Sequence, residues 1–97
     1  MEKEYRKYNQ LAEILKVLAH PVRLCIVKGL VDSGECNVTH MQSCLDVPQS
    51  TISQHLQKLR LAGIIEGRRN GLEIHYRVCS RKAVDLVHAL IGEEDSI

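Results

Sequence analysis

The side chains best suited to chemistry in this 97-residue chain are the hydroxyl and amide groups that follow Pro48. Apolar residues recur there at helical spacing, as Ile52, Leu56 and Leu59, so a helix is predicted from this point to about Ala62. Its opposite face is polar and almost uncharged, with Ser50, Ser53, Gln54 and Gln57. Such side chains can donate to and accept from base edges in the major groove, whereas an ordinary solvated face usually carries Glu and Lys.

This face predicts a helix that reads DNA, and a polar surface without function is the alternative. The residues expected to contact DNA from this helix are Gln49, Ser50, Thr51, Ser53, Gln54, His55, Gln57 and Lys58. For His55, contact with phosphate and packing beside the apolar stripe are equally compatible with the sequence.

Positive charge is concentrated around the same segment. The chain as a whole carries a net charge of only +1, but residues 48–82 hold seven basic and two acidic side chains, a local net charge of +5. Arg68 and Arg69 stand in a strand-like run just before Asn70-Gly71, and they are expected to contact phosphate beside the helix. Phosphate contacts would supply affinity, and the Ser and Gln face would supply sequence preference.

The four cysteines are the other reactive side chains. Cys36, His40 and Cys44 recur every four residues and could line one side of a helix as soft metal ligands, with a fourth ligand from elsewhere. Cys25 lies in the most apolar helix and is expected to be an inert buried thiol, although a redox role with Cys79 stays open. With no apolar signal segment and no membrane-spanning run, these thiols are expected to be reduced in a cytoplasmic protein.

The elements that must position these groups are mainly helical, in a single domain over residues 1–97. Three helices are predicted before the DNA-reading helix: Tyr8 to Leu18, Pro21 to about Val31, and a short one opened by a Thr39-x-x-Gln42 capping box and ending near Leu45. The DNA-reading helix itself could begin at Pro48 or at Thr51, and Gly63 is expected to end it in a left-handed conformation.

A β-hairpin and a last helix complete the predicted fold. Asn70-Gly71 is predicted to be the hairpin turn, followed by a half-buried strand with Leu72, Ile74, Tyr76 and Val78 on its inner side. Ser80 caps the last helix, whose apolar face of Val84, Val87, Leu90 and Ile91 is wider than a small monomer could cover, which favours a dimer. The acidic tail from about residue 92 to 97 is expected to fray. Five helices and a hairpin in this order predict a winged helix-turn-helix.

Three stretches also carry a family resemblance: residues 15–24 (LKVLAHPVRL), 48–56 (PQSTISQHL) and 70–76 (NGLEIHY). Together they resemble the signature segments of ArsR/SmtB-type repressors. The resemblance implies a homodimer joined through the first and last helices. It also implies binding to an inverted-repeat operator in double-stranded DNA and release when an effector binds.

Members of that family often sense metals, but the two best-known ligand positions do not carry ligands of the family type. Where the family's third-helix cysteines would fall, this sequence has Asn37, Thr39 and Gln42, and in place of the last-helix set it has Ser80, Lys82, Glu93 and Ser96. Such groups cannot replace a thiolate triad or a His and carboxylate tetrahedron. No cofactor is predicted, the effector is unidentified, and a metal or a thiol-reactive compound acting at Cys36 and Cys44 is the open possibility.

Two other classes of function compete with DNA binding. A winged helix used only for protein contacts would not need the local charge of +5 or the arginine pair. An enzyme would need a nucleophile with a base, a carboxylate pair or a phosphate loop, and no such spacing is present. DNA-binding regulation is therefore the predicted function.

Overall fold

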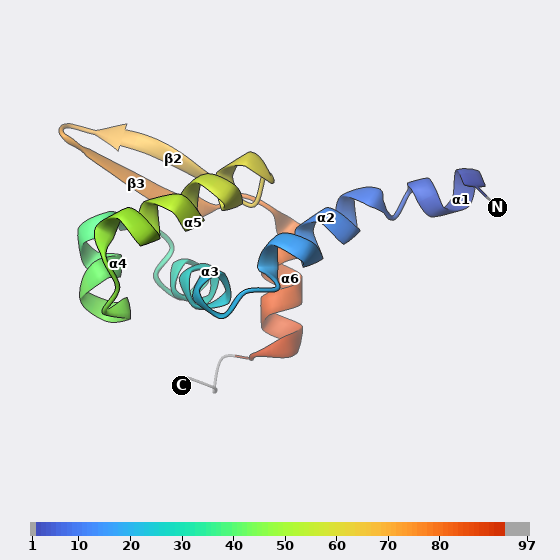
Figure 1. Ribbon diagram of the computed structural model, residues 1–97, viewed down its shortest axis with the longest axis horizontal. Coiled ribbons are helices and arrows are strands. Elements are labelled where there is room, and N and C mark those ends of the chain that lie inside the picture. Colours follow the sequence, from blue (N-terminus) through green and yellow to red (C-terminus); the bar gives the residue numbers. More distant parts are fainter. Residues whose placement is uncertain (1, 93–97) are drawn as a thin grey trace.

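The computed structural model describes residues 2–92. Three helices precede a helix-turn-helix pair: a short α1 (Glu2–Arg6) that no sequence pattern predicted, α2 (Asn9–Leu18) and α3 (Pro21–Ser33). The pair itself consists of α4 (Val38–Leu45) and α5 (Gln49–Leu61), and α6 (Arg81–Leu90) closes the described chain. The five predicted helices are therefore α2 to α6, and the expected mainly helical winged fold is confirmed (Figure 1).

Side-chain caps mark where α3, α4 and α6 begin. Pro21 is the first residue of α3, and the His20 ring caps that helix by accepting a hydrogen bond from the Val22 amide at 3.1 Å. Ser80 caps α6 as predicted, by accepting from the Ala83 amide at 3.2 Å. The helix α5 begins at Gln49, with Pro48 as the residue before it, so its start lies one residue after the first predicted option and two before Thr51.

The predicted capping box of α4 is wrong. The helix begins one residue before Thr39, and its cap is Asn37, whose side chain accepts from the His40 amide at 2.8 Å. The physical reason is an unpredicted strand, β1 (Cys36–Asn37), which holds Asn37 in extended backbone by pairing it with His75. The end of α4 is a left-handed Asp46, with a φ of 55°.

The wing is a three-stranded antiparallel sheet in the order β1-β3-β2, with β2 (Ile65–Asn70) and β3 (Glu73–Val78) as the long hairpin. Asn70 pairs with Glu73, so the two-residue loop is Gly71-Leu72 and not the predicted Asn70-Gly71. Gly71 opens this loop at a φ of 70°, a conformation that glycine adopts without steric cost. Leu72 consequently lies in the loop and is 99% exposed, which corrects its predicted place on the inner side of the strand.

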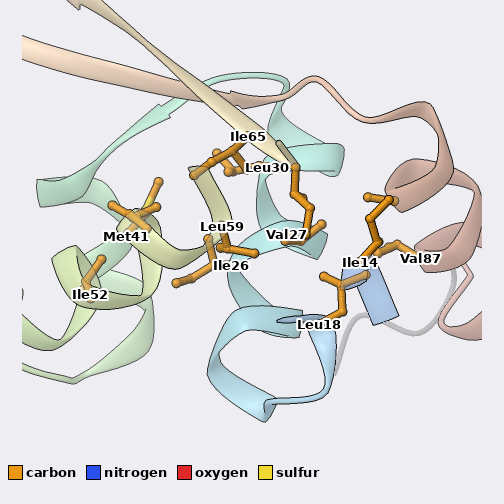
Figure 2. Close-up of a cluster of buried hydrophobic side chains, with 13 residues drawn as sticks. Ile14, Leu18, Ile26, Val27, Leu30, Met41, Ile52, Leu59, Ile65 and Val87 are labelled. Atoms are coloured by element: carbon orange, nitrogen blue, oxygen red, sulfur yellow. The ribbon is translucent and has the colours of Figure 1, made fainter. Parts of the chain in front are cut away.

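The core is a cluster of buried aliphatic side chains that runs from α2 through α3 to α5 and α6 (Figure 2). Ile52, Leu56 and Leu59 form the buried stripe of α5 as predicted, and Ile26, Val27 and Leu30 anchor α3 at the centre. Met41 is the only residue of α4 that is buried. The helix-turn-helix is thus fixed to the core through three buried side chains of α5, and through Met41 and the partly buried Val38 and Leu45 of α4.

Two further sequence predictions concern Cys25 and the acidic tail. Cys25 is exposed, which overturns the prediction of a buried core thiol, because α3 has an outward face on which Cys25, Gly29 and Ser33 recur every four residues. Residues 93–97 of the acidic tail, with Glu93 and Ser96, lie outside the described residues.

Candidate DNA-binding surface

The polar face of α5 is presented to solvent. Of the eight predicted contact residues on this helix, six are exposed, namely Gln49, Ser50, Ser53, Gln54, Gln57 and Lys58, while Thr51 and His55 are half-buried. The face therefore consists of hydroxyl and amide groups without a carboxylate, on a helix whose other side is locked into the core. Such a rigid, neutral, hydrogen-bonding surface suits direct reading of base edges.

The hairpin runs beside α5 and extends beyond it (Figure 1). A groove of about 300 Å³ separates the start of the helix from the hairpin, and it is lined by residues of both, among them Gln49, Ser53 and Glu73. Arg68 and Arg69 are exposed on β2, which is one strand of the hairpin on the other side of this groove. The polar face of α5 and the wing can therefore contact the same nucleic acid duplex.

The two wing arginines differ in their surroundings. Arg68 Nη2 donates to Glu35 Oε2 at 3.0 Å, whereas Arg69 forms no ion pair within the described part of the chain. A third arginine of the hairpin, Arg77, is paired with Glu66 at 2.6 Å, and this carboxylate raises the pKa of Arg77. Of the two predicted phosphate contacts, only Arg69 is thus available without breaking an internal ion pair.

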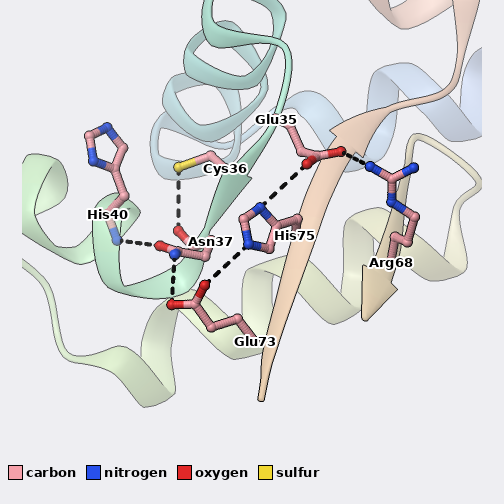
Figure 3. A network of polar contacts seen from close by, with 7 residues as sticks. All are labelled: Glu35, Cys36, Asn37, His40, Arg68, Glu73 and His75. Carbon is pink, nitrogen blue, oxygen red and sulfur yellow. Dashed lines mark hydrogen bonds and ion pairs between the residues drawn. The ribbon is translucent and has the colours of Figure 1, made fainter. Parts of the chain in front are cut away.

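Glu35 belongs to a polar network along the wing, between its middle and its loop end, that sequence reasoning missed (Figure 3). The His75 ring lies between two carboxylates, with Nδ1 at 3.4 Å from Glu35 and Nε2 at 3.2 Å from Glu73. Asn37 donates to the other oxygen of Glu73 at 3.1 Å, and so ties the start of α4 to β3. The wing is therefore fixed to the helix-turn-helix through side chains as well as through β1.

His55 faces the protein. Its Nδ1 accepts a hydrogen bond from Arg23 Nε at 3.2 Å, and its ring centroid lies 4.5 Å from that of His20. Burial lowers the pKa of His55, and the nearby His20, Arg23 and Lys58 lower it further, so the neutral ring that accepts from Arg23 is favoured. Arg23 also donates to the Val17 carbonyl, which links the end of α2, α3 and α5. Of the two interpretations of His55, this arrangement supports packing over phosphate contact.

Two of the positions at which the family resemblance would place metal ligands serve here as helix caps. Asn37 caps α4 and Ser80 caps α6, while Thr39 and Lys82 are exposed. The separate set of Cys36, His40 and Cys44 lies around one small cavity, but nowhere in residues 4–92 do three His, Cys, Asp or Glu side chains converge as a metal site. All four cysteines are free thiols.

No described helix has the length and apolar character needed to cross a membrane.

Known proteins resemble this chain over most of its length. Residues 18–68 match a family model described as a helix-turn-helix domain. A biofilm growth-associated repressor from Xylella fastidiosa is 45% identical over 85 residues, which is 88% of this chain and 74% of the relative. The crystal structure of the transcriptional repressor PagR of Bacillus anthracis is similar with a TM-score of 0.82 at 41% identity, covering 89% of this chain and 98% of that chain.

A solution structure from Mycobacterium bovis is similar as well, with a TM-score of 0.79 at 28% identity, covering 92% of this chain and 82% of that chain. It is described as a homodimeric winged helix-turn-helix DNA-binding domain of a possible ArsR-family regulator.

Proposed function

Because the chain belongs to the ArsR/SmtB-type family of helix-turn-helix transcriptional regulators, we propose that it is a homodimeric repressor of an inverted-repeat DNA operator. Its family is one of regulators and not of enzymes. A repressor acts where the DNA lies, so we assign the chain to the cytoplasm. The whole of residues 1–97 forms one DNA-binding domain in this proposal, since one cluster of buried side chains joins α2 to α6.

The observation that carries the proposal is the neutral hydrogen-bonding face of α5 beside a basic wing. We assign base contacts to the exposed Ser and Gln side chains, above all Ser53 and Gln54, with Gln49, Ser50, Thr51 and Gln57 around them. We assign phosphate contacts to Arg69, Arg68 and Lys58. His55 faces the protein and supports α5 through its hydrogen bond with Arg23.

An apolar groove between α2 and α6 supports pairing of two copies at this place. It has a volume of about 220 Å³ and is lined by aliphatic side chains of both helices, among which Leu90 is 72% and Leu15 44% exposed. Pairing two copies through α2 and α6 would cover these leucines. It would also place two copies of α5 on one duplex, with half-sites about one helical turn, or a multiple of it, apart.

The decisive experiment begins by selecting binding sites for the full chain from a pool of random duplex DNA. Enrichment of an inverted repeat is the expected result, and failure to enrich any sequence or to retain DNA at low salt would favour the winged helix as a protein-contact module.

Two variants then separate specificity from affinity on the selected duplex. Gln54→Ala is expected to cost about 1–3 kcal/mol on the selected site and less on random DNA. Arg69→Ala is expected to weaken binding to all sequences alike and to lower the salt slope by about one unit. If both variants weaken the two duplexes in the same proportion, the assignment of α5 as the reading helix is wrong.

A further inference from the structure

The outer face of α3 and the inner face of α4 enclose a small cavity of about 150 Å³. Cys25, Gly29 and Ser33 contribute from α3, and His40, Met41 and Cys44 from α4, while Cys36 of β1 closes one side. The rest of the lining is aliphatic. A volume of about this size is enough for a molecule as large as benzene.

Sulfur is concentrated around this cavity. Three of the four cysteines line it, and so does Met41, one of the two methionines in the chain. They come from three different elements, α3, β1 and α4, so helical periodicity alone does not explain the clustering. Exposed thiols beside an apolar recess suit a ligand that is itself apolar and reacts with thiolates.

A metal ion fits the cavity less well than an organic molecule does. Among residues 4–92, no three His, Cys, Asp or Glu side chains lie close enough together to hold one. An apolar electrophile needs only one thiol within reach and an apolar recess in which to bind before it reacts.

We propose that this cavity is the effector site of the protein, and that it captures small apolar α,β-unsaturated carbonyl compounds by covalent addition to Cys25 or Cys44. The inference deepens the proposed function, because it rests on the chain being a repressor that an effector releases from DNA.

The addition of a cysteine to such a compound needs no oxidant. A cysteine thiolate attacks the β-carbon of the unsaturated carbonyl, so that one S–C bond forms and the C=C π bond breaks. The electron pair moves to the carbonyl oxygen as an enolate, and the proton that the thiol lost returns to the α-carbon through water. Burial and the neighbouring Cys44 raise the pKa of Cys36, whose Sγ also points to the Asn37 carbonyl at 3.3 Å (Figure 3). The more exposed Cys25 and Cys44 are therefore the nucleophiles.

The cavity is coupled to the DNA-binding surface through Met41. This side chain is 6% exposed, is the only buried residue of α4, and lines the cavity. An adduct on Cys25 or Cys44 competes with Met41 for the same space, so it loosens α4 from the core. Since α4 packs directly on α5, the position of the reading helix relative to the wing changes with it.

The chain offers matched controls for a test. Cys79 is an exposed thiol at the junction of β3 and α6, outside the cavity, and serves as an internal reference for reactivity. A Cβ added at Gly29 meets no atom within 4 Å, so Gly29→Leu can fill the cavity while every thiol stays in place.

The first measurement compares modification rates by peptide mass mapping of the intact protein without DNA. The apolar reagent is 2-cyclohexenone, and iodoacetate is a charged thiol reagent of similar size. Cys25 or Cys44 is expected to react with 2-cyclohexenone about tenfold faster than Cys79, a gain that needs only weak binding in the cavity first. This preference should disappear with iodoacetate and in Gly29→Leu. Equal rates at Cys79 and the cavity thiols, or a preference that Gly29→Leu leaves unchanged, would overturn the proposal.

The second measurement follows release of the selected duplex by fluorescence anisotropy. Treatment with 2-cyclohexenone should release DNA from the wild type and from Cys79→Ser, but not from the double variant Cys25→Ser, Cys44→Ser. Retention of DNA by fully modified wild type would refute the cavity as an effector site. If the untreated protein binds no duplex at all, the proposed function fails, and the modification rates alone then decide whether the cavity captures electrophiles.

Discussion

Replacement of Glu35 by glutamine tests how the wing arginines meet DNA. Glu35 Oε2 lies 3.0 Å from Arg68 Nη2, in an ion pair whose side chains are 35% and 75% exposed. Glutamine preserves the shape of the side chain and removes its charge. Arg68 is thereby released to pair with a DNA phosphate, while the fold, which does not bury this pair, is expected to be unchanged.

The magnitude follows from the exposure of the pair. An ion pair as exposed as this one contributes about 0.2–1 kcal/mol, and a phosphate must displace Glu35 before it can bind Arg68. Glu35→Gln is therefore expected to tighten binding to duplex DNA by about 1.4-fold to fivefold. The salt dependence should steepen by up to about one unit, because one more phosphate contact releases its counterions.

Anisotropy titrations at several salt concentrations measure both effects on the selected duplex and on a random duplex of the same length. The gain should be equal on the two, since phosphate contacts carry no sequence information. Asp32→Asn is the matched control, because it removes the same charge from the Lys28 pair on α3 and is expected to leave affinity unchanged.

If release of Arg68 is the cause, Glu35→Gln should give no gain in DNA affinity when Arg68 is also replaced by alanine. If Glu35→Gln tightens binding as much without Arg68 as with it, or if Asp32→Asn has the same effect, general charge and not this ion pair controls affinity. Weaker binding by Glu35→Gln would show that the carboxylate holds the wing in its DNA-binding position.

Three further predictions concern stability and assembly. A Cβ at Gly67 would lie 2.9 Å from Ile74 Cγ2, so Gly67→Ala should lower the free energy of unfolding by about 1–3 kcal/mol in urea titrations, and an unchanged midpoint would show that the hairpin adjusts freely. Because the pKa of His55 is lowered in the folded state, the unfolded chain binds a proton first as the pH falls below the ordinary histidine pKa of about 6.5. The melting temperature should therefore fall in that window and level off below the folded pKa, and His55→Gln, which keeps an acceptor for Arg23, should flatten this part of the profile. Leu90→Glu places a charge in the groove between α2 and α6 and should yield a monomer in analytical sedimentation, whereas a variant that stays dimeric would place the interface elsewhere.

Patterns carried by neighbouring residues determined much of the fold from the sequence alone. The stripe of Ile52, Leu56 and Leu59 predicted α5 and its buried side, because a 3.6-residue period is a local property of the chain. Pro21 and Ser80 marked the starts of α3 and α6 for the same reason. With α5 oriented by its stripe, the exposure of Ser53 and Gln54 followed without any knowledge of tertiary contacts.

Tertiary structure decided whatever depends on segments far apart in the chain. Arg68 and Glu35 are 33 residues apart, and Asn37 and Glu73 are 36 residues apart, so no local pattern indicates either contact. The cap of α4 moved to Asn37, and the hairpin loop to Gly71-Leu72, because strand pairing fixed the register. Burial of a helix face likewise depends on which neighbours cover it. For that reason only the tertiary structure shows that Cys25 is exposed beside Cys44 in a shared cavity.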